Sequence, residues 1–194
     1  NLHLIRDINP SSILDGGAWL AHWAAEAKET WPEAEIVCVE GNPACEPFLK
    51  ESDFPYKIAM LGKEIGKGLY YKQNGTDLGT GNGLFKELTH WFEGAVVEEV
   101  NITTLDTLFP TETFSLLKLD LQGGEVDALM GGRNLVSRAD HLLLEVAVYP
   151  YNEGAVLKEF VDGFTTALGF PHQTVIGEIK HPLNHDLTIQ LDVL

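Results

Sequence analysis

A glycine turn and an acidic residue, each following a short apolar strand, are the residues of this sequence best suited to binding a ligand. Asp15-Gly16-Gly17-Ala18-Trp19 comes directly after apolar residues of strand type. Glycines in this place let the backbone approach a ligand closely, and the helix that follows offers free N–H groups. Glu40 ends the next predicted strand, where a carboxylate can accept both hydroxyl groups of a ribose. Together the two features indicate a nucleoside cofactor, although the turn alone is also common in folds that bind nothing.

Acidic residues on two later strands, and one histidine, are the candidates for catalysis. Asp120 lies near the end of a nearly all-apolar strand, and Glu145 lies within the strand after it. A carboxylate at the end of a buried strand can brace other side chains, act as a general base or bind a metal ion. Glu145 can instead bond to a backbone amide or to Lys118. We expect Asp120 and His22, one turn into the first helix, to be catalytic, and we expect no bound divalent metal, although the two carboxylates could share one.

The elements that must position these residues alternate along the chain. Short apolar runs follow amphipathic stretches, a pattern typical of a mostly parallel sheet covered by helices. The last two strands, separated by Pro182 and Asn184, are predicted to form an antiparallel pair that closes the sheet. The predicted strands are Ser12–Leu14, Glu35–Val39, Pro55–Leu61, Ser115–Leu121, His141–Val148, Thr174–Ile179 and Leu187–Leu191, and the predicted helices are Ala18–Thr30, one opened by Asn42-Pro43, Gly124–Leu135 and Glu153–Leu168.

The stretch from Gly62 to Asn101 differs from the rest of what we expect to be a single domain over residues 1–194. It is rich in Gly, Tyr and Asn, and Asn74-Gly75 is a turn signal for a hairpin. We expect a hairpin followed by a long, partly irregular loop, and loops of that length in compact domains are usually functional. This insertion and the residues around Tyr149–Asn152 are expected to select the substrate.

Composition limits the classes of partner. The chain has 194 residues, 44% of them hydrophobic, and a net charge of −16 without a Lys/Arg cluster, which disfavours a nucleic-acid partner. No apolar run reaches the length of a membrane span, and no signal segment opens the sequence. Cys38 and Cys45 do not have a zinc spacing, and we expect buried thiols in a reducing compartment, hence a cytoplasmic protein.

Four blocks of the sequence resemble, in the same order, the FkbM family of S-adenosylmethionine-dependent methyltransferases. The most specific is Lys118–Glu125, which is similar to the family's Lys-x-Asp-x-Glu-Gly-x-Glu signature. Three residues depart from the family pattern: Trp19 replaces an Asn, Ala21 replaces a Gly, and Gln122 replaces the first Glu of the signature. The blocks are Ile13–Ala18, Val39–Pro43, Gly81–Leu84, and Thr104–Leu108 with Leu117–Glu125.

This resemblance implies a Rossmann-like class I methyltransferase fold, with a mostly parallel seven-stranded sheet, helices on both faces and an antiparallel C-terminal strand. It also implies S-adenosylmethionine as cofactor, with Asp15 and Gly17 at its methionine end and Glu40 at its ribose. Met60 and Leu61 would flank the adenine, unless they are plain core residues. The expected cofactor-binding residues are Asp15, Gly16, Gly17, Ala18, Trp19, Glu40, Gly41, Asn42, Met60, Leu61 and Asp120.

The resemblance implies methyl transfer, most simply O-methylation of a hydroxyl on a small molecule or sugar, without a nucleic-acid or membrane partner. Two alternatives stay open. A nicotinamide-dependent oxidoreductase is disfavoured because no Gly-x-Gly-x-x-Gly follows the first strand. A binding domain that has kept the fold and lost the cofactor is favoured only by Trp19 and Ala21. The oligomeric state is open, with a homodimer as one option.

Overall fold

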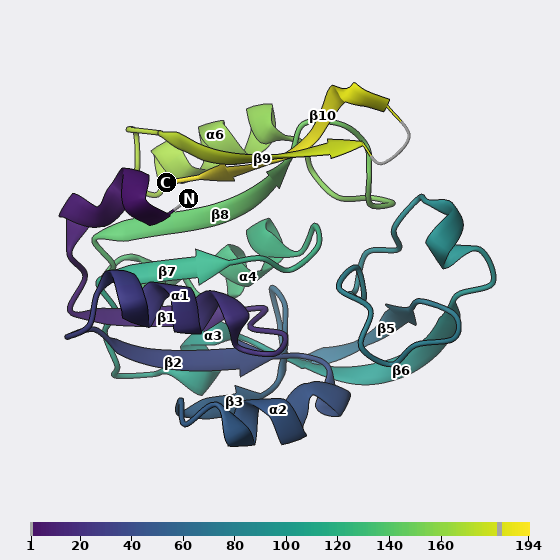
Figure 1. The fold of residues 1–194 in the computed structure, drawn as a ribbon, viewed down its shortest axis with the longest axis horizontal. Helices are drawn as coiled ribbons and strands as arrows, with labels where there is room; N and C mark the ends of the chain where they lie inside the picture. Colours follow the sequence, from purple (N-terminus) through teal and green to yellow (C-terminus); the bar gives the residue numbers. More distant parts are fainter. Residues whose placement is uncertain (1, 182–183) are drawn as a thin grey trace.

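The computed structural model describes residues 2–181 and 184–194, in which strands and helices alternate (Figure 1). The strands are β1 (Ser12–Gly16), β2 (Glu35–Glu40), β3 (Tyr56–Ile58), β4 (Met60–Leu61), β5 (Gly66–Lys72), β6 (Val96–Thr103), β7 (Leu116–Leu119), β8 (His141–Ala147), β9 (Val175–His181) and β10 (Asn184–Val193). The helices are η1 (Leu2–Ile8), α1 (His22–Thr30), η2 (Pro43–Cys45), α2 (Glu46–Glu51), η3 (His90–Phe92), α3 (Leu105–Leu108), α4 (Glu125–Gly131), α5 (Arg133–Val136) and α6 (Lys158–Ala167).

Seven strands form one sheet in the order β3-β2-β1-β7-β8-β10-β9. The first five of these are parallel, whereas β10 pairs antiparallel with both β8 and β9. The chain reverses direction across the sheet between β1 and β7, which places a ligand-binding crevice at the carboxyl ends of these strands. The predicted seven-stranded sheet and its antiparallel C-terminal pair are confirmed, while Pro182 lies outside the described residues.

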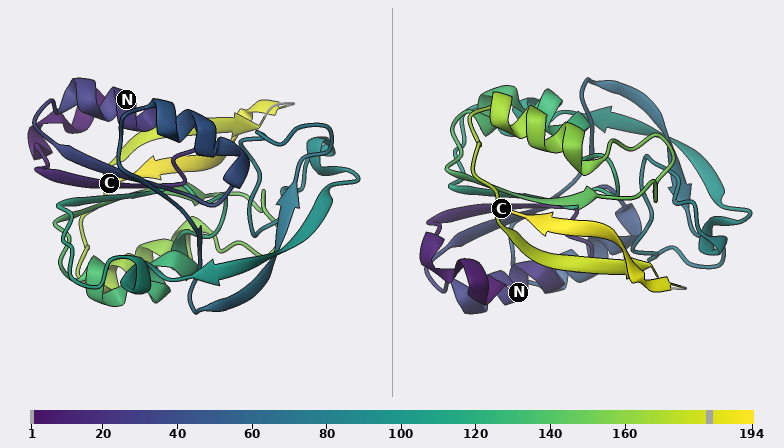
Figure 2. Two further views of the ribbon diagram at one scale, coloured as in Figure 1. Left: turned by 90° about the horizontal axis from the view of Figure 1, so that it is seen from below. Right: turned by 90° about the horizontal axis from the view of Figure 1, so that it is seen from above.

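Helices cover both faces of this sheet, and alternate residues of the central strands pack against them (Figure 2). On β1, Ile13 packs with the apolar residues of η1, α1 and α2, whereas Leu14 packs with those of α3 to α6. Leu116 and Leu117 on β7 divide in the same way. Because side chains of a strand alternate between faces, these apolar runs form two cores, one on each side. No helix in the described part of the chain is long and apolar enough to cross a membrane.

The first helix begins later than predicted. It was expected over Ala18–Thr30, but α1 starts at His22. The backbone is left-handed at both Trp19 (φ 46°) and Ala21 (φ 62°), a conformation that no helix interior can contain. The pattern of apolar side chains, from which the helix was predicted, does not indicate this tight turn.

Three other predicted elements are shorter or divided. The predicted strand Pro55–Leu61 is divided at Ala59, because β3 pairs with β2 in the large sheet and β4 pairs with β6 in a second sheet. The predicted helix Gly124–Leu135 is divided between α4 and α5. The predicted helix Glu153–Leu168 starts only at Lys158, because the N–H of Glu153 donates to the carbonyl of Lys86 instead.

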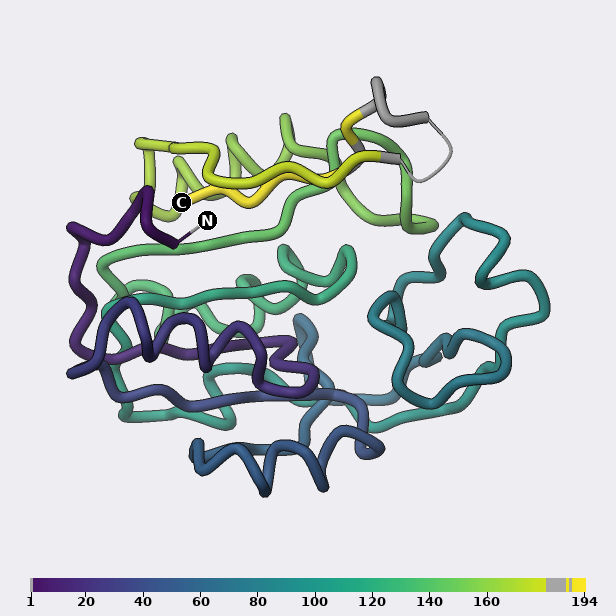
Figure 3. Tube along the Cα trace, viewed as in Figure 1, coloured from purple at the N-terminus to yellow at the C-terminus, as the bar shows by residue number. Residues whose placement is uncertain are grey.

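The insertion contributes β5 and most of β6, which pair with β4 in a second sheet of order β4-β6-β5 at one end of the molecule (Figure 3). Asn74-Gly75 makes a turn, but the antiparallel partner of β5 is β6, which starts at Val96. The predicted hairpin with a loop after it is therefore wrong: the irregular segment, residues 73–95, lies inside the hairpin. Within this segment Gly83 forms an isolated bridge with Tyr71 of β5, and Glu87 forms one with Asn152, which follows β8.

A buried ion pair joins the two central strands below the glycine turn. The ammonium group of Lys118 lies 2.9 Å from a carboxylate oxygen of Asp15 and donates to the carbonyl of Gly17 at 3.1 Å. Burial by itself would lower the pKa of Lys118, but the carboxylates of Asp15 and Asp120 raise it above its ordinary value. Burial raises the pKa of Asp15, and Lys118 opposes that rise. Each charge is therefore tolerated only because the other is present.

We predict that Lys118→Met destabilises the protein by about 3 kcal/mol, because the carboxylate of Asp15 is then buried without a counter-charge. Urea unfolding followed by circular dichroism would measure this change. Adding Asp15→Leu should restore most of the stability. Lys67→Met, which breaks the exposed pair with Glu99, is the control and should cost less than about 1 kcal/mol. Equal losses in the two single variants would contradict the prediction.

Candidate functional site

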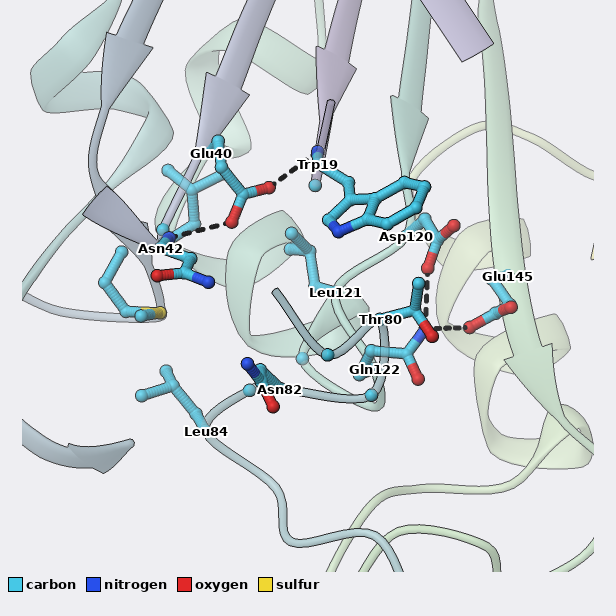
Figure 4. Close-up of a pocket in the computed structure, with 18 of the residues that line it drawn as sticks. Trp19, Glu40, Asn42, Thr80, Asn82, Leu84, Asp120, Leu121, Gln122 and Glu145 are labelled. Atoms are coloured by element: carbon cyan, nitrogen blue, oxygen red, sulfur yellow. Dashed lines mark hydrogen bonds between the residues drawn. The ribbon is translucent and has the colours of Figure 1, made fainter. Parts of the chain in front are cut away.

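A cavity of about 360 Å³ lies at the carboxyl ends of β1, β2, β7 and β8, and the insertion covers it (Figure 4). Its size is within the range of small-molecule sites. Glu40 and an acidic group that includes Asp120 and Glu145 face it from opposite sides. Among the residues predicted to bind a cofactor, those that line the cavity are Gly17, Trp19, Glu40, Gly41, Asn42, Met60, Leu61 and Asp120.

Glu40 is fixed by two backbone groups. One carboxylate oxygen accepts from the N–H of Trp19 at 2.8 Å, and the other accepts from the N–H of Asn42 at 2.7 Å. Burial raises the pKa of Glu40, while these two hydrogen bonds lower it. Each carboxylate oxygen has a second lone pair, so the group can still accept bonds from a ligand in the cavity. The glycine turn after β1 and the end of β2 are thus held in one arrangement.

The glycine turn itself is set by close backbone contact. Gly17 has a φ of 73°, and a Cβ there would lie 1.8 Å from the carbonyl oxygen of Asp120. Only glycine fits this place. The turn therefore presses against the residue that ends β7, and Gly17 and Asp120 come to line the same cavity.

Four predicted site residues do not line the cavity. Asp15 is fully buried below it and pairs with Lys118, and Gly16 and Ala18 lie within the turn without facing the space. His22 packs edge-on against the indole of Trp19, with ring centroids 5.0 Å apart. Asp15 and His22 therefore contact Lys118 and Trp19 and do not line the cavity themselves.

The acidic group beside β7 and β8 is tied together by two amide side chains. Gln122 donates to Asp120 and to Glu145, both at 2.9 Å, and Gln190 donates to the same oxygen of Glu145 at 2.8 Å. Burial and the charge of Asp120 raise the pKa of Glu145 well above its ordinary value. The amide of Gln122 lies between the two carboxylates that were candidates for a shared cation. The described residues contain no group of three or more His, Cys, Asp and Glu side chains that could hold a metal ion.

Glu125, the last residue of the signature, holds the turn that carries this group. Its carboxylate accepts from the N–H of Leu121 at 2.6 Å and from that of Gly123 at 3.3 Å. Gln122 in this turn has a left-handed backbone with φ of 54°. Burial is the main cause that raises the pKa of Glu125 to about 7, against the effect of these hydrogen bonds.

The insertion is attached to the glycine turn and to the end of β2. The indole N–H of Trp19 donates to the carbonyl of Leu78 at 3.1 Å, and the amide of Asn42 donates to the carbonyl of Asp77 at 2.6 Å. The segment 79–84 that follows lines the cavity. Trp19 thus serves as a link between the turn and the insertion, in addition to lining the site.

Sequence reasoning did not single out four further lining residues. Two come from the insertion and two lie on the C-terminal strands, so no local pattern groups them. Glycine-rich composition pointed to the insertion as a whole, and Tyr151, among the residues after β8 expected to contact the substrate, does line the cavity, but Gln190 carried no signal. The four residues are Tyr70, Glu87, Ile179 and Gln190.

The sheet order and the cavity at its carboxyl ends define the class I methyltransferase fold. Over residues 13–171 the chain matches the family model of the methyltransferase FkbM domain. The chain belongs to the FkbM methyltransferase family. No curated protein matches it in sequence.

Solved structures show the same fold at low sequence identity. The FkbM methyltransferase of Methylobacillus flagellatus KT is 13% identical, with a TM-score of 0.57 over 96% of this chain and 44% of that one. The precorrin-6y C5,15-methyltransferase of Geobacter metallireducens GS-15 is 10% identical, with a TM-score of 0.51 over 98% of this chain and 85% of that one. The chain spans less than half the length of the Methylobacillus protein.

We predict that Glu125 makes the protein less stable as pH rises from 5 to 7. Its folded pKa of about 7 exceeds the unfolded value of 4.5, so the folded state binds more protons in this window and loses stability as they leave. The loss from this residue is about 2 kcal/mol by linkage. Urea unfolding at both pH values should show it as the difference between the wild type and Glu125→Gln, which keeps an oxygen acceptor. Equal pH dependence in the two proteins would contradict it.

We predict that Trp19→Phe loosens the insertion. The change keeps an aromatic ring but removes the bond to Leu78, worth ~1 kcal/mol, so amide hydrogen exchange of Asn82 and Gly83 should accelerate roughly fivefold. Mass spectrometry of peptides over residues 76–84 would measure this. Trp91→Phe, a change at a half-exposed indole of the same insertion, is the control. Unaltered exchange in Trp19→Phe would show that the link does not hold the segment.

Proposed function

We propose that the protein transfers a methyl group from S-adenosylmethionine to a hydroxyl of a small molecule or sugar. The observation that carries this proposal is the pair of features at the crevice: Glu40 at the end of β2, held by the N–H of Trp19, and the tight turn at Gly17. Membership of the FkbM family supports the reaction class.

The cavity fits this cofactor in shape and charge. Glu40 would accept the ribose hydroxyls, and Met60 and Leu61 would flank the adenine. Gly17 and Asp120 would then hold the methionine end, where the cofactor carries an ammonium and a sulfonium. The described charged side chains that line the cavity are all carboxylates, which suits a cationic cofactor.

When bound, the cofactor supplies a methyl group on a positively charged sulfur, which is a good leaving group. The chain's main contribution is to hold an acceptor oxygen in line with that methyl carbon and to exclude water. As that methyl group was transferred from sulfur to the acceptor oxygen, a carboxylate of the chain would take the proton of the hydroxyl. Asp120, at the end of β7 and about one-third exposed, is the base we propose, with Gln122 fixing its orientation. His22 packs against Trp19 and would act only through that ring.

We predict that Glu40→Ala weakens binding of S-adenosylhomocysteine roughly tenfold or more, because hydrogen bonds to a carboxylate are worth ~1.5–3 kcal/mol. Calorimetry on the wild type and the variant would measure it, with Glu40→Gln as a milder change that retains one oxygen acceptor. Glu35→Ala, at the exposed start of the same strand, is the matched control and should bind normally.

Three results would count against the proposal. Unchanged affinity in Glu40→Ala would refute the ribose assignment. Binding of NAD but not of S-adenosylhomocysteine to the wild type would point to an oxidoreductase. Binding of neither would leave a domain that has kept the fold and lost the cofactor.

A further inference from the structure

One end of the cavity presents hydrogen-bond acceptors to any molecule that enters it. This acceptor end consists of Glu87, Glu145, Tyr151 and Gln190, which all line the cavity. Gln190 donates to Glu145, Tyr151 is hydrogen-bonded to Glu87, and Glu145 faces the cavity from the side opposite Glu40 (Figure 4). Glu87, Glu145 and Gln190 are all buried, and none of the described lining residues is a Lys, Arg or His. With the cofactor placed as proposed above, this is the space left for the methyl acceptor.

Most side-chain donors at this end are already used within the protein. Gln122 donates to both Asp120 and Glu145, and Gln190 donates one of its two N–H groups to Glu145. Tyr151 is hydrogen-bonded to Glu87, and burial together with that carboxylate raises the pKa of Tyr151. Apart from the second N–H of Gln190, what remains are the oxygens of two carboxyl groups and two amides, which accept hydrogen bonds. A bound molecule must therefore bring most of the donors.

The nearest cation, Lys118, does not supply a donor or a counter-charge to the acceptor end. Lys118 lies below the cavity and is buried, with its ammonium directed to Asp15 at 2.9 Å, the carbonyl of Gly17 at 3.1 Å and Asp120 at 3.7 Å. Two of these oxygens lie within hydrogen-bond distance and Asp120 attracts the ammonium group further, and Lys118 is not among the residues that line the cavity, so it makes no direct contact with a phosphate or carboxylate there. An anion in the acceptor end would face the carboxylates of Glu87 and Asp120 without a counter-charge, and such like-charge contacts weaken binding.

At the acceptor end, a hydroxyl group is better suited to methylation than an amine. Carboxylates near an ammonium group raise its pKa, which keeps the nitrogen lone pair protonated and unreactive. A hydroxyl keeps its lone pairs while it donates its proton to a carboxylate, so the same contact binds the group and prepares it to react.

We propose that the acceptor is an uncharged molecule with several hydroxyl groups, and that the acceptor end excludes molecules carrying a phosphate or a carboxylate beside the reacting hydroxyl. The inference rests on the proposed function for the position of the cofactor. The charge of the cavity wall does not depend on that position.

The test compares matched ligands on protein saturated with S-adenosylhomocysteine. Glucose, ribose and myo-inositol would each be titrated beside their monophosphate esters, and glucose also beside glucuronate, with affinity measured by ligand-observed nuclear magnetic resonance. We expect at least one parent polyol to bind roughly tenfold or more tightly than its charged partner. Tighter binding of any phosphate or carboxylate, equal binding within each pair, or no binding by any parent polyol up to its solubility limit would overturn the proposal.

Variants of the acceptor end test whether its carboxylates cause the preference for uncharged polyols over charged ligands. Glu87→Gln removes one charge and keeps an oxygen acceptor, and Glu145→Gln does the same at a pH above the raised pKa of Glu145. Under those conditions each variant should reduce the polyol-to-phosphate ratio at least roughly threefold. Glu33→Gln removes the same charge from an exposed turn and should leave the ratio unchanged. An unchanged ratio in both cavity variants would overturn the assignment to this wall. If S-adenosylhomocysteine does not bind, the proposed function fails by itself, and the same titrations on the free protein still judge the charge selection.

Discussion

The site depends on the contacts that the buried ammonium group of Lys118 makes. This group bonds to Asp15 and to the carbonyl of Gly17, and it attracts Asp120 at 3.7 Å, so one buried cation joins the ends of β1 and β7. The carbonyl of Asp120 in turn lies so close to Gly17 that only glycine fits there. The glycine turn therefore cannot move without the strand end that carries the acidic group. Apolar strands alone would still form the sheet, but without this pair the glycine turn would not be fixed relative to the end of β7.

The insertion covers the cavity and so completes the site. Trp19 and Asn42 lie on either side of Glu40, since both donate backbone N–H groups to its carboxylate. The same two residues use their side chains to hold Asp77 and Leu78 of the insertion. A ligand bound to Glu40 would thus lie under a segment that is attached to the residues fixing Glu40. These four hydrogen bonds therefore connect the carboxylate of Glu40 to the segment of the insertion above it.

The sequence made the large sheet predictable because a buried parallel strand must be apolar on both faces, as Ile13, Leu14, Leu116 and Leu117 are. Glu40 and the glycine turn were recognisable because their role depends on local spacing. The acceptor end could not be recognised from the sequence. Glu87 and Gln190 come to line the same cavity only because the insertion and β10 pair with distant segments of the chain. The role of Asp15 was also hidden, because its partner is set by the register between β1 and β7.

The three residues that depart from the family pattern share one backbone conformation. Trp19, Ala21 and Gln122, the three residues that differ, all have left-handed backbones. Asn and Gly, the family's residues at two of these positions, adopt that conformation most readily. The turn has therefore kept its shape with residues that are less suited to it, at a cost of ~1–2 kcal/mol for each. At two of the positions the new side chain makes bonds that bear on the site: Trp19 holds the insertion, and Gln122 joins two carboxylates. Both bonds involve residues that line the cavity, so two of the departures from the family pattern shape the site directly.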